Sequence, residues 1–188
     1  EQNPEDWWQG IVKGLKVIME KANVAKEDII GLSYSGQMHG LVALDENNNV
    51  IRPAILWCDQ RTQKQCDWIT EKAGGLEKLL TYTNNRMLTG YTGGKILWMR
   101  EEEPDNFAKM KVFICPKDYI RFLLTGVYAS EVSDAGGMQL LDVPKRTWSD
   151  EVLGALEIDR GLLGDMYESP EITGTITEDA ARLTGLLP

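Results

Sequence analysis

The sequence has few of the side chains that build redox or metal centres. It holds three cysteines, Cys58, Cys66 and Cys115, an odd number without CxxC spacing. This count argues against a disulfide framework or a structural zinc site, and it favours a reducing cytoplasm. His39 is the only histidine. A Ser-His-Asp triad or a multi-histidine metal site would therefore depend on this one residue, which limits both ideas.

An excess of positive charge and long apolar runs are also missing. The 188 residues include 29 acidic and 20 basic side chains, for a formal net charge of −9. Such a surface repels nucleic acid and anionic membranes, so we expect neither as a partner. No apolar run can span a bilayer, and residues 1–4 do not resemble a signal peptide. The length is enough for one medium domain or two small ones. The hydrophobic fraction of 43% is ordinary for a globular protein with a real core.

The first residues predict a long amphipathic helix. Asn3 is a favourable N-cap, and Pro4 suits the first helical turn. Apolar residues then recur every three or four positions, at Trp8, Ile11, Leu15, Ile18 and Ala22. At ~3.6 residues per turn, this periodicity indicates a helix of about five turns.

Extended segments are expected after this helix. We predict strands at Asp28–Ser35, Leu41–Leu44 and Val50–Trp57. The last two flank Asp45–Asn49, and Asn and Asp tolerate the left-handed backbone of a tight turn. These two strands are therefore predicted to form a hairpin.

The second half of the chain is richer in helix, with turn residues between the elements. We expect a short strand at Val112–Ile114, and a strand, turn and strand over Val127–Leu141 with Asp134–Gly137 as the turn. Helices are expected from Asp59 or Thr62 to Lys72, over Leu76–Leu80, from Thr92 or Gly93 to Pro104, and over Lys117–Thr125, Trp148–Leu156 and Glu178–Thr184. The sequence shows no repeat or long linker, so it predicts a single mixed α/β domain.

The first stretch that can carry chemistry is Ser35–Gly40. A strand end followed by glycine and polar residues is where α/β proteins place ligand contacts. Gly36 and Gly40 allow the backbone to turn on both sides of His39. The alternative is that His39 simply bonds a neighbouring carbonyl.

The second stretch, Ala54–Thr62, contains an aromatic residue followed by polar residues. Trp57 is followed by Asp59 and Gln60. An indole face beside a carboxylate and an amide suits a sugar, because the ring covers C–H groups while the polar groups bond hydroxyls. A core tryptophan followed by a helix cap explains the same residues equally well.

The third stretch, Gly90–Glu102, places a glycine-rich loop before a helix. Such loops can bind phosphate at the helix N-terminus. Lys95 is not followed by Ser or Thr, however, and the spacing is not that of a Walker loop. Taken alone, the stretch is a helix start with a structural rather than a catalytic lysine.

Together the three stretches resemble one family, the FGGY carbohydrate kinases. The third stretch fits the family signature at each constrained position: Gly90, Thr92, Lys95, Ile96, Trp98, Met99, Glu101 and Glu102. Within the family, Met38-His39 resembles xylulokinases, whereas glycerol kinases carry an Arg-Glu pair at that place. The Leu56–Thr62 stretch, the opening residues 3–8 and the Ser133–Gly136 turn are similar to xylulokinases as well.

This resemblance implies a ribonuclease H-like (actin-like ATPase) fold with the active site between two domains. Residues 1–188 would be a single partial domain, the sugar-binding N-terminal one, without its first strands. The phosphate loop would precede this chain. The catalytic aspartate of a Gly-Gly-Asp motif and the nucleotide-binding domain would follow it. A sheet without its first strands exposes an edge, so we expect either a longer chain or self-association.

The resemblance also implies a substrate, a site and partners. The full-length enzyme would phosphorylate D-xylulose at O5 with ATP and Mg²⁺, as a cytoplasmic homodimer. Met38 and His39 would contact sugar hydroxyls, Trp57 would form an apolar wall, and Asp134 would lie close to the sugar unless it is only a turn residue. No catalytic, nucleotide-binding or metal-binding residue is assigned within this chain. The alternatives are an FGGY kinase for glycerol, ribulose or gluconate, and a non-catalytic sugar-binding or actin-like module.

Overall fold

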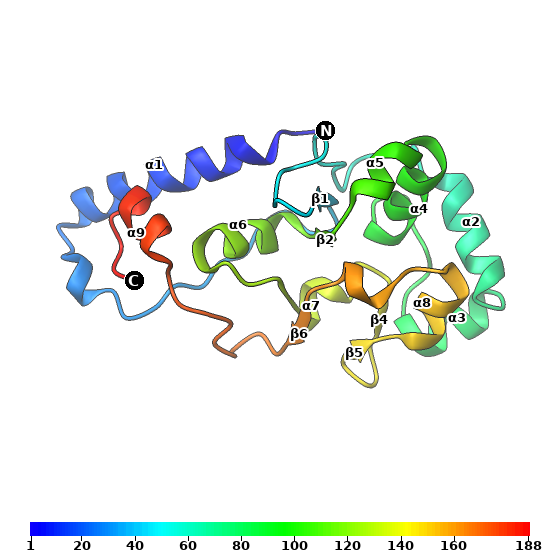
Figure 1. Ribbon diagram of the computed structural model, residues 1–188. Helices are drawn as coiled ribbons and strands as arrows, with labels where there is room; N and C mark the ends of the chain where they lie inside the picture. The colour runs from blue at the N-terminus through cyan, green and yellow to red at the C-terminus, as the bar shows by residue number, and fades with distance from the viewer.

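The computed structural model describes all residues from Glu1 to Pro188 as an elongated α/β molecule (Figure 1). Its helices are α1 (Pro4–Ala22), α2 (Gln63–Lys72), α3 (Leu76–Thr83), α4 (Thr92–Glu102), α5 (Pro104–Lys109), α6 (Pro116–Thr125), α7 (Val132–Ala135), α8 (Asp150–Leu156) and α9 (Glu178–Thr184), with 3-10 turns η1 (Lys26–Asp28) and η2 (Arg160–Leu162). Its strands are β1 (Val42–Leu44), β2 (Val112–Ile114), β3 (Ala129–Glu131), β4 (Leu141–Asp142), β5 (Thr147–Trp148) and β6 (Asp165–Tyr167). In Figure 1, α1 and α9 lie side by side at one end, and α2, α3, α4, α5 and α8 gather at the other.

The antiparallel pair of β1 and β2 separates two hydrophobic cores. We call the cluster of 23 buried residues the larger core, and the cluster of 13 the smaller core. Side chains alternate between the two faces of a strand. Ala43 and Phe113 accordingly belong to the larger core, whereas Val42, Leu44, Val112 and Ile114 belong to the smaller core. This pair is buried on both faces, which explains its continuous apolar sequence.

The predicted first helix is confirmed in its start and its length. The Asn3 carboxamide oxygen accepts a hydrogen bond from the Glu5 N–H at 3.2 Å, and Pro4 opens α1. The helix ends at Ala22, and its C-cap Asn23 has a left-handed φ of 51°. Trp8 and Val12 face the smaller core, whereas Ile18 is 63% exposed. The helix therefore covers the smaller core with only one part of its apolar stripe.

The strand predicted over Asp28–Ser35 is wrong. Residues 29–38 form no regular element, and Ile30 is fully exposed. A strand requires a neighbour that pairs with its backbone, and no described segment pairs with this one. The extended pattern is present in the sequence, but the fold provides no ladder for it.

The predicted hairpin is present in weakened form. The Asp45 carboxylate accepts hydrogen bonds from the Asn47 and Asn49 N–H groups, which closes the predicted turn. The second arm, predicted over Val50–Trp57, pairs with the first only through isolated bridges near its two ends. Pro53 lies between these bridges and has no N–H to donate.

Most helices of the second half are confirmed, with differences in their bounds. α9 has the predicted bounds, and α3 extends beyond the predicted Leu80 to Thr83. Pro104 ends α4 as expected but also opens α5, because its fixed φ suits the first turn of a new helix. Trp148 belongs to β5 rather than to α8, which Ser149 caps by accepting the Val152 N–H.

The strand, turn and strand predicted over Val127–Leu141 correspond to β3, α7 with the turn that follows it, and β4, but the two strands do not pair with each other. β3 pairs in parallel with β6, and β4 pairs with β5. The predicted turn, Asp134–Gly137, begins inside the helical turn α7 and continues beyond it. Within the described chain, no helix has both the length and the apolarity to cross a bilayer.

Candidate functional site

The backbone at His39 adopts a conformation that side chains other than glycine rarely occupy. Its φ is 64°, and the Gly40 N–H donates to the Met38 carbonyl at 2.8 Å, which closes a three-residue turn around His39. Left-handed φ and tight γ-turns are costly for a residue with a Cβ atom. Such strain persists where the surroundings hold it, and it is concentrated at functional sites.

Two side chains of α4 hold this turn. The Lys95 ammonium donates to the His39 carbonyl at 2.7 Å and to the Gly90 carbonyl at 2.6 Å. The Thr92 hydroxyl donates to the same His39 oxygen at 3.1 Å. Lys95 is fully buried, so its role is structural as expected from the sequence: it ties the turn at His39 to the loop at Gly90.

The imidazole of His39 lies against a glycine and an aromatic ring. A Cβ atom built on Gly137 would overlap the ring, so only glycine allows this approach. The ring of Tyr91 packs edge-on, with 4.4 Å between the ring centroids. These two contacts and the backbone turn determine where the imidazole points.

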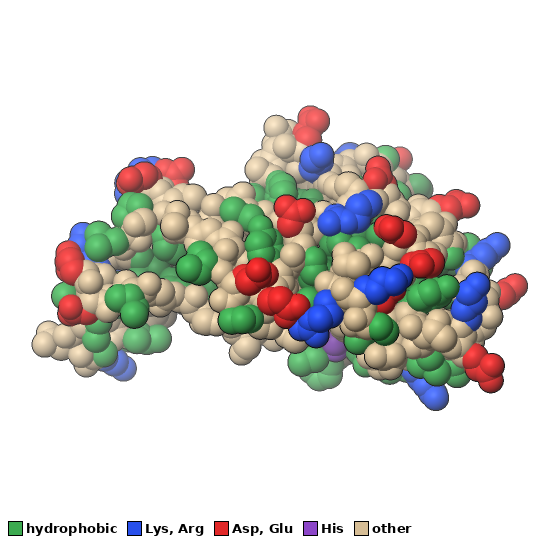
Figure 2. Space-filling view, turned by 90° about the horizontal axis from the view of Figure 1, so that it is seen from below, with side chains coloured by type: hydrophobic (Ala, Val, Ile, Leu, Met, Phe, Trp, Pro, Cys, Tyr) green, Lys and Arg blue, Asp and Glu red, His purple; other side chains and the backbone are tan.

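The imidazole keeps its polar capacity. Its Nδ1 is buried against the backbone of Gly137, without a hydrogen bond of ordinary geometry. Burial and the positive charge of Lys95 lower the pKa of His39. The ring is therefore neutral at neutral pH, with one nitrogen able to donate and the other to accept. In Figure 2 the single histidine reaches the surface beside apolar side chains.

Asp134 reaches the same place from α7. Its helical turn is capped by Glu131, whose carboxylate accepts the Ser133 and Asp134 N–H groups at 2.9 and 2.8 Å. The Asp134 carbonyl accepts the N–H of Gly137, the glycine under the His39 ring. Gly137 thus contacts the ring of His39 and the backbone of Asp134, two predicted site residues that lie far apart in the sequence.

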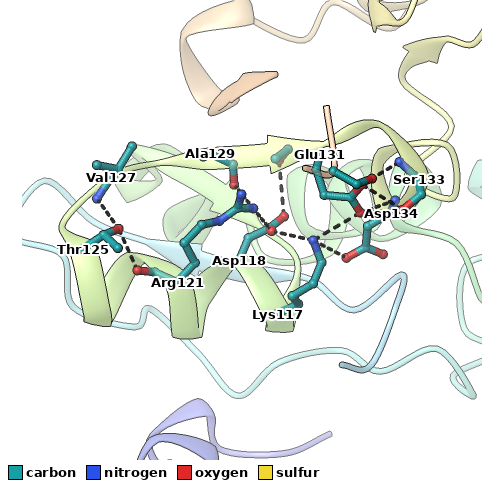
Figure 3. Close-up of polar contacts among 11 residues, drawn as sticks. Lys117, Asp118, Arg121, Thr125, Val127, Ala129, Glu131, Ser133 and Asp134 are labelled. Atoms are coloured by element: carbon teal, nitrogen blue, oxygen red, sulfur yellow. Dashed lines mark hydrogen bonds and ion pairs between the residues drawn. The ribbon is translucent and has the colours of Figure 1, made fainter. Parts of the chain in front are cut away.

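Lys117 lies among three carboxylates, as Figure 3 shows. Its ammonium is 3.0 Å from Asp118, 3.3 Å from Glu131 and 3.6 Å from Asp134. Asp118 is also paired with Arg121, and Glu131 with backbone and hydroxyl donors. Of the three carboxylates, only that of Asp134 has an oxygen, Oδ1, that is buried without a hydrogen-bond partner.

These contacts give the two acidic groups of the turn opposite pKa shifts. Burial, together with the negative charges of Asp118 and Glu131, raises the pKa of Asp134 to about 6, although Lys117 acts against this rise. Hydrogen bonds from Ser169, Ser133 and the backbone outweigh burial and hold the pKa of Glu131 at about 2. Glu131 is thus a fixed anion, whereas Asp134 can change its protonation near neutral pH.

Met38 and Trp57 are the exposed members of the predicted set. Their exposed fractions are 54% and 55%, so Trp57 is not the core tryptophan that the sequence left as an alternative. A Cβ atom on Gly90 would lie 2.6 Å from the Trp57 carbonyl oxygen, so a glycine there lets the Trp57 backbone approach the loop that Lys95 holds. An exposed indole and an exposed thioether suit the C–H faces of a ligand.

Asp59 and Gln60, weaker candidates from the sequence, are occupied by other partners. Asp59 forms a bidentate pair with Arg61, at 2.9 and 2.7 Å. The Gln60 carboxamide oxygen accepts the Thr89 hydroxyl at 2.6 Å. Both side chains stabilise the loop before α2.

Cys115, Asp118 and Asp134 are near enough to one another to be tested as metal ligands. One ligand atom from each lies within 4.8 Å of the others. Lys117 and Arg121 already neutralise the carboxylates, and burial raises the pKa of the Cys115 thiol well above its usual value. A protonated thiol and two resident cations oppose a metal ion, so this group does not fit a metal site.

Comparison with known proteins identifies the class. The model of the FGGY family of carbohydrate kinases, N-terminal domain, matches residues 1–188. The chain belongs to the FGGY family of carbohydrate kinases, as its signature indicated. It is 46% identical over 187 residues to the xylulose kinase of Bacillus subtilis (strain 168), an alignment that covers 100% of this chain and 37% of that protein. The chain thus spans little more than a third of this relative's length.

Solved structures agree with this assignment. A xyloylose kinase from Brucella ovis superposes with a TM-score of 0.89 at 31% identity, covering 95% of this chain and 37% of that one. A gluconate kinase from Lactobacillus acidophilus gives 0.86 at 23% identity, covering 99% and 37%, which shows the fold alone. The expected ribonuclease H-like, actin-like fold class is confirmed by this likeness to sugar kinases.

The sequence did not identify Lys117, Glu131 and Gly137 as parts of the site. Lys117 follows Pro116 at a helix start, which has the pattern of an ordinary first turn. Glu131 and Gly137 flank α7, where the sequence indicated only a turn. Their roles depend on contacts between distant segments, so no local signal could have revealed them.

Proposed function

We propose that residues 1–188 are the sugar-binding domain of a longer kinase that phosphorylates D-xylulose at O5 with MgATP. The family membership supports the reaction class. The xylulose kinases among its relatives support the substrate, as does the Met38-His39 pair. In this proposal Met38, His39, Trp57 and Asp134 contact the sugar.

The observation that carries the proposal is that two of the predicted site residues each have a buried polar atom without a hydrogen bond of ordinary geometry. These atoms are His39 Nδ1 and Asp134 Oδ1, and Gly137 links their two segments. Buried polar atoms without partners are uncommon and indicate a missing bonding group. Sugar hydroxyls donate and accept hydrogen bonds, so they fit both atoms.

Phosphoryl transfer itself requires groups outside residues 1–188. It depends on positioning and on electrostatic stabilisation of the phosphates, usually with Mg²⁺. In our proposal a preceding phosphate loop, a following Gly-Gly-Asp general base and a C-terminal nucleotide-binding domain supply these functions. The full-length enzyme is proposed to be a cytoplasmic homodimer, consistent with the three free cysteines.

A substrate panel on the full-length protein tests this proposal. We expect ATP-dependent phosphorylation with the highest kcat/KM for D-xylulose among D-xylulose, ribulose, glycerol and gluconate. His39→Ala and Asp134→Ala should raise the KM for the sugar while leaving the KM for ATP unchanged. Lys64→Ala is the matched control, because Lys64 is an exposed residue of α2 whose ammonium pairs with Glu101 of α4.

The other outcomes separate the alternatives. A preference for gluconate or glycerol would move the protein to another member of the family. Sugar binding without any ATP turnover would indicate a non-catalytic module. A titration of tryptophan fluorescence with D-xylulose distinguishes this last case, because exposed Trp57 should report a sugar on its face.

A further inference from the structure

Lys95 combines complete burial with the absence of an acidic partner. Its side chain has no exposed surface, and its ammonium contacts the carbonyl oxygens of His39 and Gly90. No carboxylate lies within ion-pairing distance of it. Burying an unpaired cation is costly, and burial lowers the pKa of Lys95 to about 8. A neutral apolar residue would avoid this cost, so the ammonium is retained for what it binds.

The surroundings exclude a direct chemical role for this ammonium. It is directed at two backbone oxygens, at 2.7 and 2.6 Å. A nucleophilic or proton-transferring lysine needs access to the substrate, and a fully buried one has none. Its effect must therefore pass through the residues whose carbonyls it holds.

Of these two residues, His39 is the one under strain. Its φ of 64° is left-handed, and residues 29–38 before it form no helix or strand. The carbonyl of His39 accepts two hydrogen bonds from α4, one from Lys95 and one from Thr92. This oxygen is thus the point at which an unpaired segment is fixed to the larger core.

We propose that Lys95 and Thr92 are positioning residues that hold the His39 turn so that the imidazole points at the sugar. The inference rests on the proposed function, since it presumes that His39 binds the sugar. It gives the lysine and the threonine of the family signature a role in sugar affinity rather than in phosphate binding.

The first test is Lys95→Met in the full-length protein, with Lys64→Met as the matched control. Methionine matches the side chain of Lys95 as far as Cε but lacks the ammonium and its donors, so the turn at His39 can relax. Misplacing a binding group by about 1 Å can cost about 100-fold. We expect the KM for D-xylulose to rise by about 10- to 100-fold, while the KM for ATP stays unchanged. Lys64 is exposed, so its variant should retain wild-type constants.

A matched pair at Thr92 keeps the test valid if Lys95→Met does not fold. Thr92→Val has nearly the same shape but lacks the hydroxyl that bonds His39, whereas Thr92→Ser retains it. The loss of one neutral hydrogen bond predicts a rise of about 2- to 10-fold in the sugar KM for Thr92→Val. Thr92→Ser should restore the wild-type KM, a rescue that loss of packing alone would not produce.

A double-mutant cycle with His39→Ala decides the mechanism. If Lys95 or Thr92 acts through the imidazole, its substitution has no further effect on the sugar KM once the imidazole is removed. Additive effects, or an unchanged sugar KM in both Lys95→Met and Thr92→Val, would overturn the inference while leaving His39 as a sugar ligand. An unchanged sugar KM in His39→Ala would overturn the proposed role of His39 and this inference with it.

Discussion

The two ends of the molecule differ in how completely they bury their apolar side chains. Around the larger core, residues such as Phe113, Ile96 and Met138 have no exposed surface. Around the smaller core, α1 buries Trp8 and Val12 but leaves Ile18 and other apolar residues exposed. The first, which we call the closed region, buries most of its apolar surface, although Leu80 of α3 is still 37% exposed. The second, which we call the open region, covers only part of its apolar surface.

The candidate site lies where these two regions meet, and it takes residues from both. His39 ends the unpaired segment, while Lys95 and Thr92 belong to the central helix of the closed region. Because this segment pairs with no strand, its backbone geometry at His39 depends on the hydrogen bonds that Lys95 and Thr92 donate. We therefore expect substitutions in the closed region to affect both stability and the site, and substitutions at exposed apolar positions of the open region, such as Ile18 and Ile30, to affect neither strongly.

Phe113→Ala should have the largest effect, a loss of stability in the closed region. The side chain is fully buried in β2 and faces the larger core. Removing a buried phenylalanine should lower the free energy of unfolding by about 3–5 kcal/mol, as measured by urea denaturation followed by circular dichroism. A loss below about 1 kcal/mol would show that the larger core is not closed in the way we describe.

The next effect concerns Gly137, beneath the His39 ring. The methyl group of Gly137→Ala would overlap the imidazole, so the ring must move, and we expect sugar affinity to fall by up to about 100-fold. Gly154→Ala is the control: a methyl group there meets nothing within 4 Å, and Gly154 lies inside α8. This control should raise the free energy of unfolding by about 0.5–1 kcal/mol without changing affinity. Equal sugar affinities in the two variants would show that Gly137 is not part of the sugar site.

The pH dependence of sugar binding gives a third test. The pKa of Asp134 is raised to about 6 by burial and by Asp118 and Glu131, against the effect of Lys117. We expect sugar affinity to fall as the pH is lowered through about 6, because the carboxylate is then protonated. His39, whose pKa is lowered by burial and by the charge of Lys95, gains its proton at a pH below its usual value. Calorimetric titrations of the wild type and Asp134→Asn should separate the two groups, since the carboxamide of the variant does not titrate.

The same shift has an opposite consequence for stability. Because the folded pKa of Asp134 lies above its ordinary value of 3.8, the folded state binds the proton more tightly than the unfolded state does. The contribution of Asp134 to stability therefore increases as the pH falls from about 6 toward 4. Glu131, with its pKa lowered to about 2, contributes stability above its ordinary pKa and loses it as the pH falls toward 2. A stability profile of Asp134→Asn that matched the wild type would contradict the raised pKa.

The smallest expected effect is that of Ile30→Ser. Ile30 is fully exposed in the unpaired segment, so its substitution should change the free energy of unfolding of the 188-residue chain by less than about 0.5 kcal/mol. The same substitution in the full-length protein tests the domain proposal. If further strands of a longer chain cover this segment, the cost there should exceed that in the 188-residue chain; an equal, negligible cost would argue against such a covering.

Much of the fold was predictable because its signals are local. The cap at Asn3, the turn at Asp45 and the stop at Gly126 each act through neighbouring residues. Strand pairing was not predictable in the same way. The strand expected over Asp28–Ser35 has no partner, and the sequence did not indicate that β3 pairs with β6 or that β4 pairs with β5.

The same distinction between local signals and long-range contacts applies to the candidate site. The residue types at Met38, His39 and Trp57, with the signature around Lys95, were sufficient to name the family from the sequence. They could not reveal that Lys95 holds the His39 carbonyl, that Gly137 seats the imidazole, or that Lys117 faces three carboxylates. Such contacts join residues distant in the chain, and their geometry follows from how the elements pack.

The sequence by itself therefore determined the family, most helices and the residue types that a sugar site requires. Only the tertiary structure decided which of these residues meet, which polar atoms remain unpartnered and which acidic group can change its charge near neutral pH. The physical reason is that helix starts, turns and hydrophobic periodicity depend on neighbouring residues. Burial, hydrogen-bond satisfaction and pKa shifts depend on whatever the folded chain places alongside.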